Sequence, residues 1–75
     1  MKFVKKVKEE IKKARNGHKN MTSAHEAYAV ILEELDEFKI EVFKKEKSRN
    51  KQNMLDELVQ LGAMAQRAAE DLKLI

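Results

Sequence analysis

The chain contains no proline and only two glycines, Gly17 and Gly62, so almost every position is free to adopt a helical backbone. Ala, Leu, Glu and Lys, which favour helices, are abundant, and strand-forming residues never alternate with polar ones over a useful length. Gly17 tolerates the left-handed conformation that ends many helices. The sequence therefore predicts an all-α fold, and its 75 residues fit a single domain over 1–75.

Apolar residues recur at spacings of three and four in segments that predict helices over about residues 2–15, 23–45 and 50–74. The second helix begins at a capping box, in which the Ser23 side chain caps a backbone amide and Glu26 reaches back. Ser48 or Asn50 is expected to cap the third.

The second and third helices are expected to pack as an antiparallel hairpin, with the N-terminal helix covering it. A chain of this size buries only about 60% of its unfolded surface, and without cysteine it has no disulfide to add stability. We therefore expect a homo-oligomer, a dimer or a tetramer, that forms an oligomeric helical bundle. Val30 is an apolar residue on the otherwise acidic face of the second predicted helix, which indicates burial of this face by another subunit. The expected core stripes are Tyr28, Ile31, Leu35, Phe38 and Val42 on the second helix and Leu55, Leu58, Gly62, Ala65, Ala69 and Leu72 on the third.

Basic residues concentrate in the first helix and in Lys44–Lys51, and the formal net charge is +3. Such patches attract phosphates, nucleic acids or anionic lipids. No aromatic residue interleaves with a basic run as a base-stacking surface requires, which argues against nucleic acid as a partner. The sequence contains no run of about 18 apolar residues, so no segment is expected to cross a membrane. The N-terminus does not resemble a signal peptide. The cytoplasm is the expected compartment.

Two acidic clusters, Glu33–Glu37 and Asp56-Glu57, lie within the second and third predicted helices. At about 100° per residue, Glu34, Glu37 and Glu57 border the stripes that are expected to face each other, so their carboxylates can meet at the rim of the hairpin. Carboxylates from facing helices form divalent-metal sites in helical bundles, and hard cations prefer oxygen ligands. An ordinary solvated acidic face has the same spacing and is the alternative interpretation.

The pattern Glu33-Glu34-x-x-Glu37, followed after nineteen residues by Glu57-x-x-Gln60, resembles that of the MazG-like all-α nucleoside triphosphate pyrophosphatases. The strings SAHEAYAVILEELDEF and MLDELVQLGAMAQRAAEDL resemble the phage and prophage branch, and the resemblance covers roughly residues 22–73. It implies hydrolysis of a (deoxy)nucleoside triphosphate between its α and β phosphates, releasing pyrophosphate. The implied cofactor is Mg²⁺, with Mn²⁺ as a possible substitute.

The resemblance also implies roles for individual residues. Glu34, Glu37 and Glu57 would be metal ligands, and Glu33 would be a ligand or the catalytic base that activates water. Gln60 would complete the metal site, although the family has an aspartate there and an amide adds no charge. The family usually has a further helix after this motif, whereas this sequence stops at Ile75.

Four basic residues between the acidic helices are candidate phosphate contacts, with a solvated turn as the alternative: Lys45, Lys47, Arg49 and Lys51. Arg67 is expected to form a surface salt bridge with Glu70 or Asp71, and a phosphate contact is the less favoured interpretation. Two other functions stay open. Besides the pyrophosphohydrolase, the alternatives are a non-catalytic member of the family that binds nucleotide or protein, and a small basic helical protein that binds nucleic acid.

Overall fold

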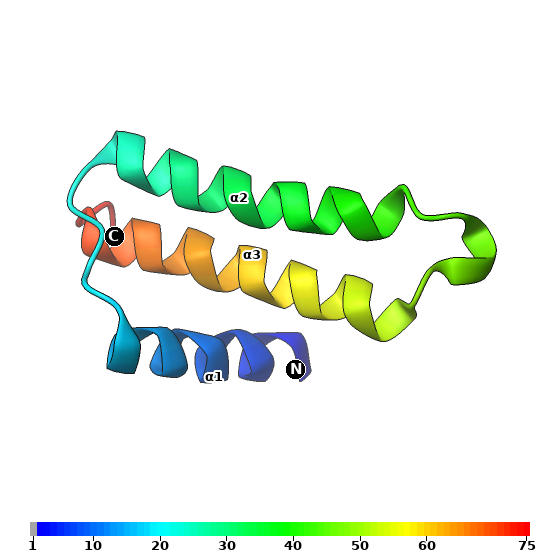
Figure 1. Cartoon of the computed structure of the whole chain (residues 1–75). Coiled ribbons are helices and arrows are strands. Elements are labelled where there is room, and N and C mark those ends of the chain that lie inside the picture. Colours follow the sequence, from blue (N-terminus) through cyan, green and yellow to red (C-terminus); the bar gives the residue numbers. More distant parts are fainter. Residues whose placement is uncertain (1) are drawn as a thin grey trace.

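The computed structural model describes residues 2–75, which form three α-helices and one short 3-10 helix without any strand (Figure 1). The all-α prediction is therefore confirmed for these residues. The second helix ends a few residues earlier than predicted, and so does the third. The elements are α1 (Lys2–Gly17), α2 (Ala24–Val42), η1 (Glu46–Ser48) and α3 (Lys51–Asp71).

Side-chain caps fix where the two long helices begin. The Ser23 hydroxyl accepts a hydrogen bond from the Glu26 N–H at 3.1 Å, as the capping box predicts. The Glu26 carboxylate reaches back one residue further than expected and accepts from the Thr22 N–H at 2.6 Å. At the start of α3, the side-chain oxygen of Asn50 accepts from the Asn53 N–H at 3.0 Å, so Asn50 is the cap.

The ends of the helices differ from the prediction. Gly17 is the last residue of α1, but it does not take the left-handed conformation, which among residues 2–75 is confined to Lys73 (φ 58). The N–H of Lys73 donates to the Glu70 carbonyl at 3.1 Å, and the N–H of Leu74 donates to the Ala69 carbonyl at 2.9 Å. This pair of bonds is the Schellman pattern, and it closes α3 before Leu74.

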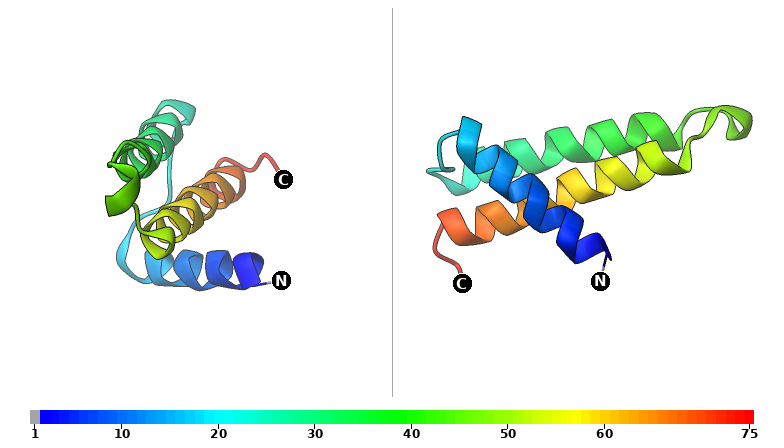
Figure 2. Two further views of the ribbon diagram at one scale, coloured as in Figure 1. Left: turned by 90° about the vertical axis from the view of Figure 1, so that its right-hand side faces the viewer. Right: turned by 90° about the horizontal axis from the view of Figure 1, so that it is seen from below.

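Helix α3 is the central element. It runs antiparallel to α2 along one flank, whereas α1 crosses its other flank obliquely (Figure 2). Within residues 2–75, α1 and α2 both pack against α3 but not directly against each other. The predicted hairpin with an added N-terminal helix is therefore correct, and it leaves a groove between α1 and α2.

The core is small and rich in alanine and methionine. Among residues 2–75 no large side chain is fully buried, and the buried apolar residues are Val7, Ile11, Met21, Ala27, Val59, Ala63, Met64 and Ala68.

The predicted stripes on α2 and α3 are correct only in part, because Ile31, Leu55 and Leu72 pack against the core whereas other members are exposed. Tyr28 and Leu35 are 69% and 47% exposed, and Leu58 is 37% exposed, whereas Ala27 and Ala68 are buried. Helices that pack through alanine approach closely, so larger side chains are displaced to the flanks. Apolar periodicity alone does not distinguish these two groups of residues.

Candidate functional site

Three carboxylates converge between α2 and α3. Glu34 and Glu37 lie one turn apart on the same side of α2, and Glu57 approaches them from α3. Each offers an oxygen atom, and these three atoms all lie within 4.8 Å of one another. Glu34 and Glu57 are half-buried, while Glu37 is exposed. We call these three residues the acidic triad.

Two oxygen atoms of the acidic triad are sealed from solvent without a partner. Oε2 of Glu34 and Oε2 of Glu57 accept no hydrogen bond from residues 2–75, although most buried polar atoms in proteins have a partner. The nearby Lys44 ammonium is already paired with both oxygens of Glu41 at 3.0 Å. Within the described chain, no ion pair reaches the triad. Its negative charge is therefore uncompensated.

This arrangement changes the acidity of two of the three residues. Burial, followed by the charge of Glu37, raises the pKa of Glu34 to about 7. Burial and a hydrogen bond to Glu37 also raise the pKa of Glu57. Two ionised carboxylates cannot hydrogen-bond to each other, so the contact between Glu57 and Glu37 becomes a hydrogen bond only when one of the two holds a proton. Near neutral pH the triad therefore either retains a proton or attracts a cation.

A groove with a volume of about 570 Å³ lies over α3, between α1 and α2. Small-molecule sites fall within this size range. Its lining is mixed in charge: acidic residues come from α1 and α2, and basic residues come from α1, α3 and the segment between α1 and α2. The residues that line it include Glu33, Glu34, Gln60, Arg67, Lys19 and Val30.

The predicted site residues on α2 and α3 that lie outside the triad line this groove. Glu33 is exposed in the groove wall next to Glu34. Gln60 is half-buried, and its amide nitrogen donates to Oε2 of Glu10 on α1 at 2.8 Å. Val30 is half-buried and packs against the core of its own chain, so no second subunit is needed to explain its burial.

The predicted phosphate-contacting residues lie apart from the groove. All four are exposed, in and beside the connection between α2 and α3, and none of them lines the groove: Lys45, Lys47, Arg49 and Lys51. The Arg49 side chain donates from Nε to the Val42 carbonyl at 3.0 Å. Arg49 therefore helps to hold the connection against the end of α2.

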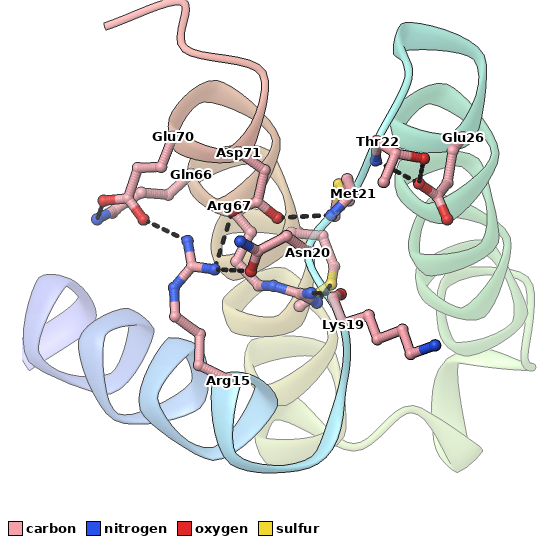
Figure 3. Close-up of polar contacts among 11 residues, drawn as sticks. Arg15, Lys19, Asn20, Met21, Thr22, Glu26, Gln66, Arg67, Glu70 and Asp71 are labelled. Carbon is pink, nitrogen blue, oxygen red and sulfur yellow. Dashed lines mark hydrogen bonds and ion pairs between the residues drawn. The ribbon is translucent and has the colours of Figure 1, made fainter.

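The predicted surface salt bridge of Arg67 is wrong. Its side chain is only 5% exposed and donates to the Lys19 carbonyl at 3.1 Å (Figure 3). It is Arg15 from α1 that pairs with Glu70 at 2.8 Å and with Asp71 at 2.9 Å. The segment between α1 and α2 covers this part of α3, which buries Arg67. Sequence spacing carries no signal for this contact.

Asp71 anchors the same segment. Its carboxylate accepts a hydrogen bond from the Met21 N–H at 2.8 Å, and only 2% of its side chain is exposed (Figure 3). Burial opposes ionisation of Asp71, but the Met21 N–H and the Arg15 guanidinium outweigh it and lower the pKa of the carboxyl. We call Arg15, Glu70 and Asp71 the paired cluster.

Comparisons of this chain with family models, with curated proteins and with solved structures find no match in any of the three. The resemblance to MazG-like enzymes therefore rests on this sequence alone, through the spacing of its glutamates and the strings that contain them. No helix within residues 2–75 has the length and apolar character needed to cross a membrane.

Proposed function

We propose that this chain is a magnesium-dependent nucleoside triphosphate pyrophosphohydrolase that releases pyrophosphate from a (deoxy)nucleotide. It would resemble the phage and prophage branch of the MazG-like enzymes and act in the cytoplasm as a homo-oligomer. The observation that supports this most strongly is the acidic triad, with its two sealed and unpartnered oxygens beside a groove of ligand size. The MazG-like spacing of the glutamates adds the reaction class.

The donor set fits a hard divalent cation. Mg²⁺ and Mn²⁺ prefer carboxylate oxygens, and an ion held by Glu34, Glu37 and Glu57 would satisfy the two oxygens that lack a donor. When bound, such an ion would neutralise phosphate charge and polarise a phosphoryl oxygen. A solvated acidic face does not require the oxygens to be buried, so their burial favours the metal interpretation.

Other residues of the chain would serve the substrate. Glu33 is exposed beside Glu34 in the groove, where its carboxylate can orient a water molecule and accept its proton. Lys19 and Arg67 line the same groove, so they supply positive charge that complements phosphates. The exposed residues near the α2–α3 connection remain a second candidate set for the phosphate contacts: Lys45, Lys47, Arg49 and Lys51.

A non-catalytic relative that binds nucleotide without hydrolysis is the alternative. The observation that favours it concerns Gln60, which is uncharged where the family pattern has an acid and which is hydrogen-bonded to Glu10 on α1. An amide held in this way contributes less to metal affinity than a free carboxylate. Binding of the metal and the nucleotide without turnover would favour this alternative.

The test is to incubate the purified chain with a panel of nucleoside triphosphates, with and without Mg²⁺, and to measure pyrophosphate. We expect release that needs the metal and is lost in both Glu34→Gln and Glu57→Gln. The matched control is Asp36→Asn, which removes an exposed carboxylate from the same helix outside the triad. Release that is independent of metal, or that survives both triad substitutions, would contradict the proposal.

A further inference from the structure

The surface area of the chain is too large for a compact monomer. Its accessible surface is 5932 Å², whereas a folded monomer of 8.7 kDa is expected to expose about 4,700 Å². Its radius of gyration is 13.2 Å, against about 11 Å for a compact domain of this length. The excess area, about 1,200 Å², is comparable to the roughly 800 Å² that one partner loses in a standard interface.

Four exposed large apolar side chains lie along one side of α2 and its C-cap residue. At about 100° per residue, Tyr28, Leu32, Leu35 and Phe43 fall within an arc of about 80°. They are 69%, 39%, 47% and 76% exposed, respectively. Lys39 also falls within this arc, and its ammonium lies 5.7 Å from the centre of the Phe43 ring. Exposed apolar side chains gathered on one side of a helix mark interaction sites in soluble proteins. We call these four residues the outer stripe.

The outer stripe faces away from the groove. Val30 and Glu33, which line the groove, lie about 140–160° around α2 from Leu35. Helix α3 repeats this pattern, because Gln60 and Arg67 line the groove about 160–180° away from the exposed Leu58.

Leu58 extends the stripe onto α3. Glu57 lies level with Glu34 and Glu37 of the antiparallel α2, which places the next residue, Leu58, level with Leu35. The exposed Ala65 lies about 20° from Leu58, and its small side chain permits close approach of another helix. The apolar surface therefore covers the outer side of the hairpin, opposite the groove.

The outer stripe is self-complementary along its length. Tyr28 precedes Leu35 by about 10 Å of helix, and Phe43 follows it by about 12 Å, so an aromatic residue stands near each end with leucines between. If two copies of α2 pack antiparallel about a two-fold axis near Leu35, Tyr28 of each copy lies beside Phe43 of the other. A two-fold interface requires a patch that complements itself in this way.

We infer that the outer side of the hairpin binds a second copy of this chain, through the outer stripe and Leu58, to form a two-fold dimer. The groove stays open on the opposite side, and the acidic triad lies between the two faces, where Glu34 is about 100° around α2 from Leu35. This dimer follows from the exposed area and the pattern of apolar residues and does not depend on the proposed enzymatic function. Its subunit contact lies at Leu35 rather than at Val30.

The test is the mass in solution, measured by light scattering at about 50 µM, where an interface of micromolar affinity is occupied. We expect twice the chain mass of 8.7 kDa for the parent. Leu35→Glu should give a single-chain mass, because it places two charges at the centre of the interface. Ile40→Glu is the matched control, since Ile40 is an exposed apolar residue of the same helix about 140° away from Leu35.

A second variant separates dissociation from unfolding. Ala65→Glu changes an exposed residue of α3, so the helical circular dichroism should be retained while the dimer dissociates. A parent that is monomeric at about 50 µM would overturn the inference. So would a dimer that survives both Leu35→Glu and Ala65→Glu, or one that Ile40→Glu disrupts equally.

Discussion

The acidic triad and the paired cluster each contain a buried carboxylate oxygen, but their surroundings affect the ionised form in opposite ways. Asp71 meets an arginine and a backbone N–H, which together lower the pKa of its carboxyl despite its burial. Glu34 meets other carboxylates instead, and burial together with Glu37 raises its pKa to about 7. The paired cluster contains a cationic partner for its carboxylates, whereas the acidic triad has none among the described residues.

The difference separates a structural role from a functional one. The paired cluster joins α1, α3 and the segment between α1 and α2, so it stabilises the arrangement that forms the groove. The triad joins α2 to α3 at an energetic cost, since like charges repel and two oxygens lack donors. Groups with strongly shifted pKa values and a specific electrostatic cause are concentrated at functional sites.

The largest expected effect comes from breaking the paired cluster. Asp71→Ala removes the buried partner of Arg15 and the acceptor of the Met21 N–H, so we expect a loss of about 2–4 kcal/mol in the free energy of unfolding. Urea denaturation at a fixed protein concentration measures it. The control is Asp56→Ala, which removes an exposed carboxylate that accepts a hydrogen bond from Gln52, and it should cost less than about 0.5 kcal/mol. Equal losses would mean that the cluster contributes no special stability.

Removing a charge from the acidic triad should increase the free energy of unfolding rather than reduce it. In the metal-free protein, Glu34→Gln should raise the free energy of unfolding at about pH 8 by on the order of 1–3 kcal/mol, because it abolishes the repulsion and the cost of burying an anion. At about pH 4, where Glu34 is protonated in both states, the substitution should change little. Denaturation in the presence of a chelator at the two pH values measures the difference.

The direction in which stability changes with pH follows from the raised pKa of Glu34. The pKa of Glu34 rises from an ordinary value of 4.5 to about 7 on folding, so the unfolded chain loses this proton first as the pH rises. The stability that Glu34 contributes is full below pH 4.5 and is lost by about pH 7. Asp71 behaves in the opposite way, because its pKa is lowered and its contribution is lost in acid. Asp36→Asn should leave the loss between these pH values intact, and its disappearance in that control would contradict the assignment to Glu34.

A smaller effect is expected at Gln60, which connects the groove to α1. Gln60→Asp removes the hydrogen bond to Glu10 and brings two carboxylates together, so we expect destabilisation of about 1 kcal/mol. Glu10→Gln in the same chain should restore much of this loss, because its amide can donate to the new aspartate. A double-mutant cycle by urea denaturation measures the coupling. If the two changes are simply additive, Gln60 and Glu10 do not interact.

Much of the fold could be predicted because it depends on local chemistry. The absence of proline and the caps at Ser23 and Asn50 favour these helices whatever contacts the rest of the chain makes. The convergence of the acidic triad could also be anticipated, since the spacing on each helix places Glu34 and Glu57 at the rim of a hairpin. Their roles as ligands stay predictions.

Other features depend on contacts between distant segments and have no local signature. The sequence does not distinguish the buried Ala68 from the exposed Ala65, because both lie within the same apolar pattern. The burial of Arg67 follows from the position of the segment that contains Lys19 and Met21, which Asp71 holds by accepting from the Met21 N–H across 50 residues of sequence. Spacing along a single helix contains none of this information.

The most direct test of the central claim is a magnesium titration in weak buffer at about pH 6.5, recording proton release and the melting temperature together. Near this pH Glu34 retains a proton in the free protein, and a bound cation must displace it. We expect proton release and a rise in melting temperature for the parent, and loss of both in Glu34→Gln. Addition of about 10 mM Mg²⁺ that releases no proton and leaves the melting temperature unchanged would show that the acidic triad is not a metal site.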